Sequence, residues 1–101
     1  MNSKLFRGSL DTIILKLLSD GHEMYGYEIT QKVRDMTKGE FDITEGALYP
    51  ALHKLESQGI LETESRNIGN RMRKYYKLTH KGHTEVKDVI HDMEAFIKNL
   101  Q

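Results

Sequence analysis

The sequence predicts a mainly α-helical fold with one small β-hairpin, and three observations support this prediction. Residues 44–59 combine a helical leucine pattern with a terminal glycine. Residues 66–78 combine strand alternation with concentrated positive charge, and residues 79–101 repeat apolar side chains at helical spacing. A chain of 101 residues is expected to form one compact unit that buries roughly two-thirds of its unfolded surface.

The composition argues against several classes of function. The chain has no cysteine, which excludes a disulfide framework, thiolate chemistry and a cysteine-based zinc site. The N-terminus is too polar for a signal peptide and no apolar run approaches ~18 residues, so we expect no membrane span and a cytoplasmic protein. The motifs of phosphate-binding loops and zinc peptidases are missing, which argues against an enzyme and gives no reason to expect a cofactor.

Two amphipathic helices are expected in the first part of the chain. The first should cover about Gly8 to Ser19, because its apolar residues recur at helical spacing. These residues are Leu10, Ile13, Ile14, Leu17 and Leu18. The second should run from Tyr25 to Met36, with Ile29, Val33 and Met36 facing inward. Phe41 is expected to return to the core after the turn that follows.

A third helix should begin after Thr44, which is a good N-cap residue, and end at Gly59. Its buried face is expected to consist of Leu48, Leu52 and Leu55. Its exposed face would then carry Gly46, Tyr49, Pro50, His53 and Ser57. Pro50 removes one backbone hydrogen bond, so we expect a single helix whose start is locally loosened.

The segment after this helix predicts a basic hairpin. The whole chain has no net charge, but residues 66–82 carry six basic side chains and no acidic one. Strand alternation places Tyr76 and Leu78 on the core side and directs Arg71, Arg73 and Lys77 outward. A helix followed by a basic two-stranded wing is typical of winged-helix proteins, in which the helix enters the major groove of DNA and the wing lies along phosphates.

The last helix should start near Thr79 and reach almost to the C-terminus. Its apolar stripe consists of Val86, Val89, Ile90, Met93, Phe96, Ile97 and Leu100. A helix of ~22 residues is roughly 33 Å long, more than a small winged head needs to cover itself. The stripe is therefore expected to meet a second copy of the chain, with folding back onto its own domain as the alternative. Residues 1–79 would form the winged-helix domain and residues 80–101 the dimerisation helix.

Three segments of the chain resemble the PadR family of bacterial transcriptional regulators. They are LDTIILKLLSDGHEMYGYEI near the N-terminus, GALYPALHKLESQGIL in the third helix and RKYYKLTHKG at the end of the hairpin. The single C-terminal helix is similar to that of the small subgroup. The resemblance implies a winged helix-turn-helix fold and a homodimeric repressor that binds a pseudo-palindromic operator in double-stranded DNA.

The resemblance also implies roles for particular residues. Thr44, Gly46, Tyr49, His53 and Lys54 would lie at the major groove, and Tyr25 would approach a phosphate. Arg71, Arg73 and Lys74 would be the wing contacts, and Arg66 belongs to the same basic run. Packing in the core is the alternative role for Tyr49. The dimer interface is expected to contain Val89, Met93, Phe96, Ile97 and Leu100.

The sequence departs from the family pattern in two places. The tip of the wing reads Gly69-Asn70-Arg71-Met72-Arg73-Lys74, where many members have Gly-Gly-Pro-Arg-Arg-Lys. Some small relatives stack flat drugs on a tryptophan of the last helix, and Met93 stands at that position here. A small apolar effector remains a hypothesis, with Asp11, Met93 and Phe96 as its pocket.

Two other functions fit parts of the sequence. His80 and His83 have the spacing of two metal ligands on a helix, but no third ligand accompanies them, so no metal site is expected. The basic wing could instead bind an acidic protein partner, because a winged helix does not by itself fix function.

Overall fold

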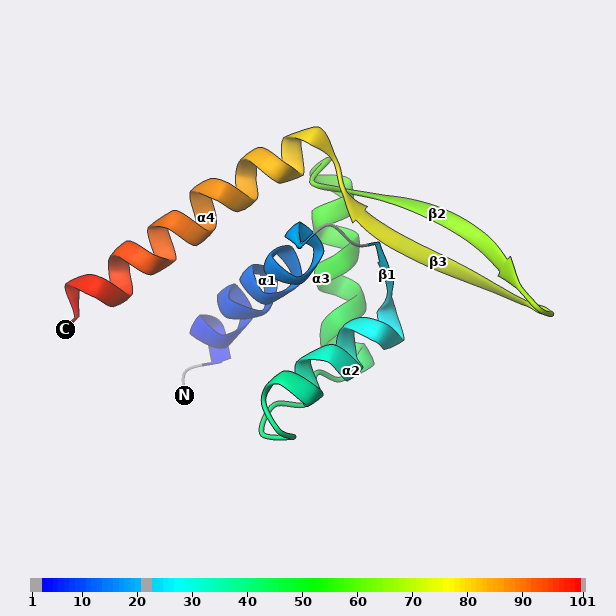
Figure 1. Cartoon of the computed structure of the whole chain (residues 1–101), viewed down its shortest axis with the longest axis horizontal. Helices are drawn as coiled ribbons and strands as arrows, with labels where there is room; N and C mark the ends of the chain where they lie inside the picture. The colour runs from blue at the N-terminus through cyan, green and yellow to red at the C-terminus, as the bar shows by residue number, and fades with distance from the viewer. Residues whose placement is uncertain (1–2, 21–22, 101) are drawn as a thin grey trace.

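The computed structural model describes residues 3–20 and 23–100 of the chain. Within these residues, four helices and three strands follow one another in the order expected for a winged helix (Figure 1). They are α1 (Ser3–Ser19), β1 (Met24–Tyr25), α2 (Gly26–Met36), α3 (Glu45–Ser57), β2 (Leu61–Ile68), β3 (Arg71–Leu78) and α4 (His80–Asn99). None of these helices is long and apolar enough to cross a membrane.

The core lies where α1, α2 and α3 meet the base of the sheet. The leucine face expected for α3 is confirmed, since Leu48, Leu52 and Leu55 are at most 3% exposed. Thr44 caps this helix by accepting a hydrogen bond from the backbone N–H of Ala47. Residues 45–57 form one continuous helix with Pro50 inside it. The inward leucines therefore fix which side of α3 faces solvent.

Two expectations for the α2 region are wrong. Met36 is 66% exposed, because the last turn of α2 extends past the helices that cover Ile29 and Val33. Phe41 is 39% exposed rather than packed in the core. The chain leaves α2 through a turn in which two consecutive residues at 38–39 have positive φ angles, and this turn directs the following segment along the surface.

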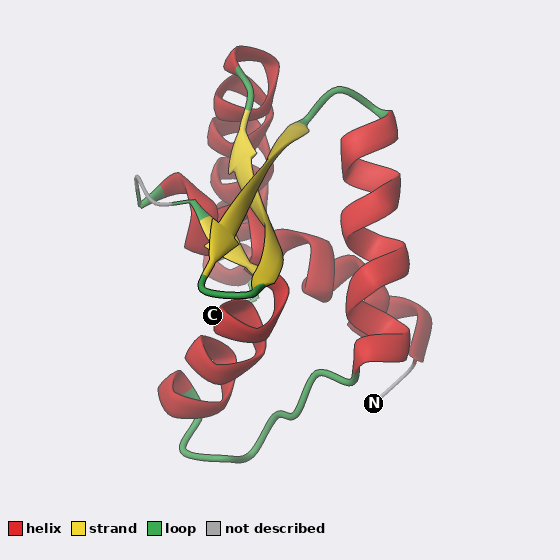
Figure 2. Ribbon diagram, turned by 90° about the vertical axis from the view of Figure 1, so that its right-hand side faces the viewer, coloured by secondary structure: helices red, strands yellow, loops and turns green. Residues whose placement is uncertain are grey.

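The hairpin expected from the sequence is present, and a short third strand supports it. Strands β2 and β3 pair over their whole length, from Leu61 opposite Leu78 to Ile68 opposite Arg71. The sequence places Tyr25 in a helix, but Met24 and Tyr25 form the short strand β1, which pairs with β3 on its other side. Beyond these two residue pairs the hairpin projects from the body as a two-stranded ribbon (Figures 1 and 2).

Helix α4 divides into two halves with different surroundings. Near its start, Val86 is buried and Ile90 packs against the core. Farther along, the apolar side chains of the stripe are largely exposed, at 60% for Phe96, 51% for Ile97 and 71% for Leu100. The helix runs beside α1 in Figure 1 and continues beyond the body. The first half thus folds back onto its own domain, whereas the second half leaves an apolar face open.

The start of α4 is attached to the end of α3 by a close backbone contact. The Thr79 hydroxyl accepts a hydrogen bond from the Gly82 N–H at 2.9 Å and donates one to the Gly59 carbonyl at 2.6 Å. Gly82 lies directly against the Ile60 carbonyl, so a Cβ at this position would overlap that oxygen. A glycine is needed here because the neighbouring atom belongs to the backbone and cannot move aside.

We therefore predict that Gly82→Ala lowers the free energy of unfolding by about 1–3 kcal/mol, the range expected for an overpacked site. Gly46→Ala is the matched control, because a Cβ at Gly46 meets no atom closer than 3.9 Å and alanine favours helix. Urea unfolding of both variants tests this pair. Equal stability of the two variants would contradict the close contact at Gly82.

Candidate nucleic-acid interface

The exposed face of α3 contains the residues that the sequence predicts for it. Within α3 and its cap they are Thr44, Gly46, Tyr49, Pro50, His53, Lys54 and Ser57, all of them exposed. The rings of Tyr49 and His53 lie one turn apart, with centroids separated by 6.5 Å. Their polar atoms are hydrogen-bonding groups of the kind that bind base edges or phosphates.

Tyr49 also determines how α3 meets α2. Its hydroxyl and ring lie against Gly26, where a Cβ would come within 2.5 Å of the Tyr49 oxygen and 2.9 Å of the adjacent ring carbon. Gly26 is buried at the first turn of α2. Tyr49 is nevertheless 37% exposed, so one ring both packs on α2 and remains open to solvent. Tyr49 therefore packs against α2, and its exposed part leaves the predicted role at the groove open to it as well.

The register of the hairpin distributes its cations over two faces. Residues opposite each other on paired strands share a face of the sheet. Arg66 is opposite Arg73, and Ile68 is opposite Arg71, so the three arginines share the outer face. Lys74 lies on the other face, with Tyr76. Of the three predicted wing contacts, the lysine therefore starts from the opposite face of the hairpin from the two arginines.

A cleft of about 350 Å³ brings residues of three elements together. It is lined by the start of α2, the exposed face of α3 and the hairpin: Tyr25, Gly26, Tyr49, His53, Met72, Arg73, Lys74 and Tyr76. Five of these were predicted as DNA contacts from the sequence, and the cleft joins them from three separate parts of the chain, near residues 25, 49–53 and 73–74. Met72 was missed, because its 65% exposure on a strand that otherwise alternates could not be foreseen from residue type.

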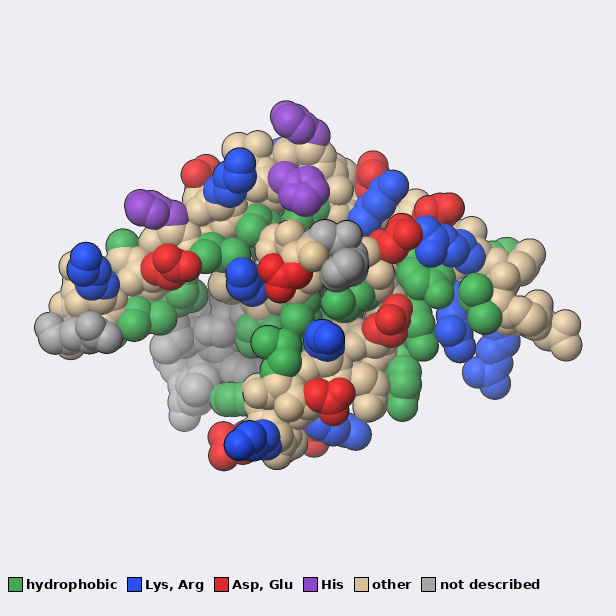
Figure 3. Space-filling view, in the orientation of Figure 1, with side chains coloured by type: hydrophobic (Ala, Val, Ile, Leu, Met, Phe, Trp, Pro, Cys, Tyr) green, Lys and Arg blue, Asp and Glu red, His purple; other side chains and the backbone are tan. Residues whose placement is uncertain are grey.

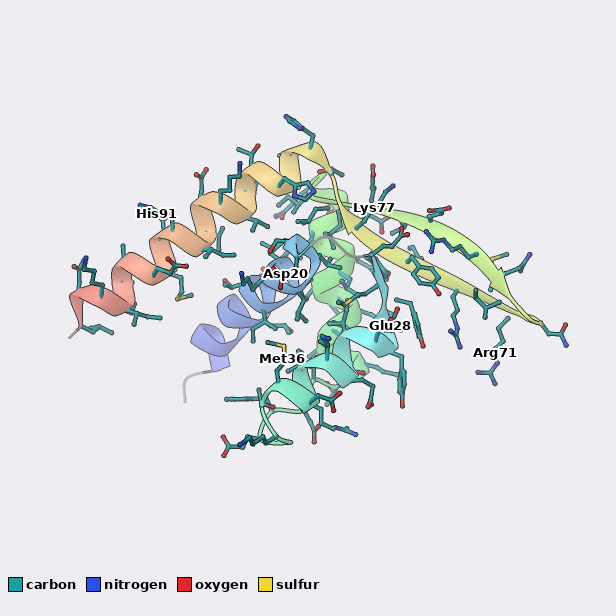
Figure 4. All side chains as sticks on the ribbon, viewed as in Figure 1. Asp20, Glu28, Met36, Arg71, Lys77 and His91 are labelled. Carbon is teal, nitrogen blue, oxygen red and sulfur yellow. The ribbon has the colours of Figure 1, made fainter. Side chains whose placement is uncertain are left out.

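The cations of the interface differ in whether a carboxylate already neutralises them. Arg66 donates to Glu23 at 2.5 Å and to Glu64 at 3.0 Å. Lys54 pairs with Asp11, and Lys74 pairs with Glu56 at 3.5 Å. Among the described residues no carboxylate lies within 4.0 Å of Arg71 or Arg73. The wing cations with unpaired charge are therefore the two outer-face arginines nearest the tip; Figure 4 labels Arg71 there, directed away from the ribbon.

Electrostatics around Arg66 follow from these contacts. Hydrogen bonds to Glu23 and Glu64 raise the pKa of Arg66 above its ordinary value. The hydrogen bond from Arg66 lowers the pKa of Glu64. Both shifts favour the charged forms, so this ion pair persists at neutral pH. Arg66 stays a predicted DNA contact, and in this structure its charge is paired with Glu23 and Glu64.

Arg73 is held by an aromatic ring instead of a carboxylate. Its guanidinium carbon lies 4.4 Å from the centroid of the Tyr25 ring. Tyr25 meets Tyr75 edge to face at a centroid distance of 5.5 Å. A cation over an aromatic face is attracted by the ring quadrupole while its N–H groups stay available to a phosphate. Tyr25 thus contributes to the interface by orienting Arg73.

The other predicted sites lie on the opposite side of the molecule from the wing. Asp11 belongs to α1, whereas Met93 is half-buried and Phe96 exposed on α4, so the effector pocket stays a prediction. The α1–α4 groove, of about 490 Å³, is lined by Val86 and Ile90 and otherwise by polar and charged side chains. Figure 3 shows histidine side chains together with basic and acidic ones over this part of the surface, and basic and acidic side chains side by side along the hairpin. No cluster of three metal-binding side chains occurs in the described residues.

These features define a class of protein. A solvent-facing helix preceded by a second helix, next to a hairpin with unpaired arginines, is the arrangement of a winged-helix DNA-binding domain. The profile of the transcriptional regulator PadR-like family matches residues 14–88, and the chain belongs to this family. Its members are DNA-binding transcription regulators and not enzymes.

Individual relatives agree with this assignment. The structure of a transcriptional regulator from Clostridium thermocellum matches with a TM-score of 0.86 and 34% identity, over 99% of this chain and 94% of that one. Bacillus subtilis PadR in complex with operator DNA matches with a TM-score of 0.73 and 30% identity, over 81% of this chain and 45% of that one. Transcriptional regulator Rv3488 of Mycobacterium tuberculosis is 31% identical over 79 residues, which cover 78% of this chain and 71% of that protein.

The contact between Tyr49 and Gly26 yields a prediction about α3. Gly26→Ala should lower the free energy of unfolding by about 1–3 kcal/mol, because the new methyl group displaces the Tyr49 ring. The same change made in a Tyr49→Ala background should cost much less, since the obstructing ring is absent. Urea unfolding of the two single variants and the double variant measures this coupling. Additive effects would show that Gly26 is required for another reason.

Proposed function

We propose that this protein is a homodimeric, sequence-specific regulator that represses transcription by binding a pseudo-palindromic operator. The observation that carries the proposal is the cleft that joins the exposed face of α3 to Arg73 and Tyr25. Base-reading groups on α3 and a phosphate-binding arginine on the wing would then contact one duplex together. The similarity to Bacillus subtilis PadR, whose structure is a complex with operator DNA, supports the same partner.

Acidic residues near the interface would oppose DNA binding if they were uncompensated, so their surroundings matter. Glu56 lies on α3 but is paired with Lys74 and accepts a hydrogen bond from Thr63. Glu64 is paired with Arg66. These carboxylates are therefore compensated within the chain, whereas Arg71 and Arg73 keep their charge for a partner. This balance favours a polyanion, and the fit of a helix beside a wing favours duplex DNA over an acidic protein.

The open half of α4 supports a dimer. Met93, Phe96, Ile97 and Leu100 continue an apolar stripe whose last three members are more than half exposed in the single chain. Large apolar side chains gathered on one helix face are typical of protein–protein contacts. Pairing through these helices would place two copies of α3 on the same side of the assembly. Half-sites one helical turn apart would require a separation of ~34–36 Å between them.

Relief by a small apolar effector is the proposed mode of regulation. Met93 and Phe96 would lie at the dimer contact, next to α1, which carries Asp11. Asp11 is in a salt bridge with Lys54 of α3, so α1 and the DNA-facing helix are directly connected. A ligand that changes how α4 packs would change the separation of the two copies of α3 and weaken binding. A ligand can shift this equilibrium only by its difference in affinity between the two arrangements.

The proposed function predicts the outcome of a selection from a random duplex library at two salt concentrations. We expect enrichment of an inverted repeat that survives the higher salt, because base contacts add to the salt-sensitive phosphate contacts. Sequencing of the retained fragments gives the operator directly. Retention without sequence preference, lost at the higher salt, would contradict the proposal and favour the acidic-partner alternative.

The proposed dimer predicts that Phe96→Glu produces a folded monomer with weak operator binding. Phe96 is exposed in the single chain, so the substitution leaves the core intact but places a charge in the apolar contact. Ala95→Glu is the matched control, because Ala95 is also exposed and lies off the apolar stripe. Sedimentation equilibrium gives the oligomeric state of each. A stable dimer with unchanged operator affinity in Phe96→Glu would rule out this interface.

A further inference from the structure

An ion pair between Glu23 and Arg66 crosses the sheet. Arg66 is on β2 and Glu23 directly precedes β1, and β3 lies between these two strands. The Arg66 side chain therefore spans the middle strand, with its Nη2 atom 2.5 Å from the Glu23 Oε1 atom. On the way its guanidinium lies 4.4 Å from the centroid of the Tyr75 ring on β3. One side chain thus links all three strands.

This ion pair lies where the hairpin leaves the body of the protein. β1 supports β3 through only two residue pairs, Met24 with Tyr76 and Tyr25 with Tyr75. Arg66 is opposite Arg73, two residues nearer the tip than Tyr75. Beyond this level the ribbon has no third strand within the described residues. A restraint at this position limits rotation of the whole wing relative to α3.

The same face carries the arginine that the proposed function uses. Arg73 lies over Tyr25, and Tyr25 contacts Tyr75, which in turn lies under Arg66. The two arginines and the two rings therefore form a continuous chain of contacts that ends at Glu23. A shift of Arg66 would disturb Tyr75 and, through it, the ring that orients Arg73.

We propose that Glu23 is a specificity-determining positioning residue for DNA binding. By holding Arg66 across the sheet, it fixes the angle of the wing and keeps one cation away from the phosphates. Phosphate contacts strengthen binding to every duplex, whereas discrimination requires the helix and the wing to fit one geometry. An acidic residue at this position therefore lowers non-specific affinity and raises selectivity. This inference rests on the proposed function.

The test compares Glu23→Gln with the wild-type protein on the selected operator and on a scrambled duplex over a range of salt concentrations. Loss of the contact with Glu23 leaves Arg66 paired only with Glu64 of its own strand. Binding to the scrambled duplex should therefore tighten several-fold at low salt, and its salt dependence should steepen by up to about 0.9, the slope of one full added phosphate contact. The ratio of operator to scrambled affinity should fall about tenfold, which is the scale of one mismatched base pair. Fluorescence anisotropy titrations measure all three quantities.

Two further variants separate the ion pair from a simple change in charge. Glu62→Gln removes a carboxylate of the same hairpin that pairs with Lys77 at 3.5 Å without crossing the sheet, and it should preserve the affinity ratio. Arg66→Lys keeps the positive charge but loses the planar guanidinium that reaches two carboxylates, so it should lower the ratio as Glu23→Gln does. Unchanged melting temperatures would show that each variant is folded.

The double variant tests whether Glu23 acts through Arg66. In an Arg66→Gln background, Glu23→Gln should have no further effect on the affinity ratio. An equal effect in both backgrounds would mean that Glu23 acts on DNA directly, and the inference would be overturned. An unchanged ratio in Glu23→Gln alone would also overturn it while leaving operator binding intact. Failure of the wild-type protein to select any operator would instead overturn the proposed function.

Discussion

Burial of Tyr76 at the centre of the sheet is the interaction on which the interface depends. Tyr76 pairs with Met24 on one side and Thr63 on the other, and it is 1% exposed. Burial raises the pKa of its hydroxyl, so the residue stays neutral and can remain in the core. Because this side chain anchors β3 between β1 and β2, it fixes the place at which the hairpin leaves the body of the protein. The cleft beside α3 is lined by the same residue.

Contacts within the chain decide which basic side chains of the interface keep an unpaired charge and how those side chains are oriented. Six basic residues occur in the segment 66–82, yet Arg66, Lys74 and Lys77 are paired with carboxylates of neighbouring segments. Arg73 is placed by a ring instead, so its hydrogen-bonding groups remain available. The number of basic residues in a sequence therefore indicates attraction to DNA only after the residues paired with carboxylates of the same chain have been identified. Lys81 donates to the Gln58 carbonyl beside α4, so the basic residues of the hairpin without a carboxylate partner among the described residues are Arg71 and Arg73.

Glycine has two different uses in this structure, and both concern how helices approach each other. Because Gly26 has no side chain, the Tyr49 ring can pack against it and bring α3 close to α2. Because Gly82 has no side chain, the Ile60 carbonyl can lie against it and bring the segment after α3 close to α4. Both contacts meet α3 or the segment that follows it. These two contacts therefore hold α3 against α2, and the segment after α3 against α4.

The helices, the leucine face of α3, the cap at Thr44 and the alternation that buries Tyr76 and Leu78 could be predicted from the sequence. These features depend on spacing and side-chain type within a few residues. Local patterns did not predict the place of Tyr25 in a strand, the exposure of Met36 and Phe41, the cap at Thr79 or the pairing of Arg66. Apart from the cap, each of these depends on residues far apart in the chain, such as Glu23 and Arg66, which no local pattern relates. Strand pairing and ion pairing are set by the approach of whole elements, and that approach is fixed only when the core packs.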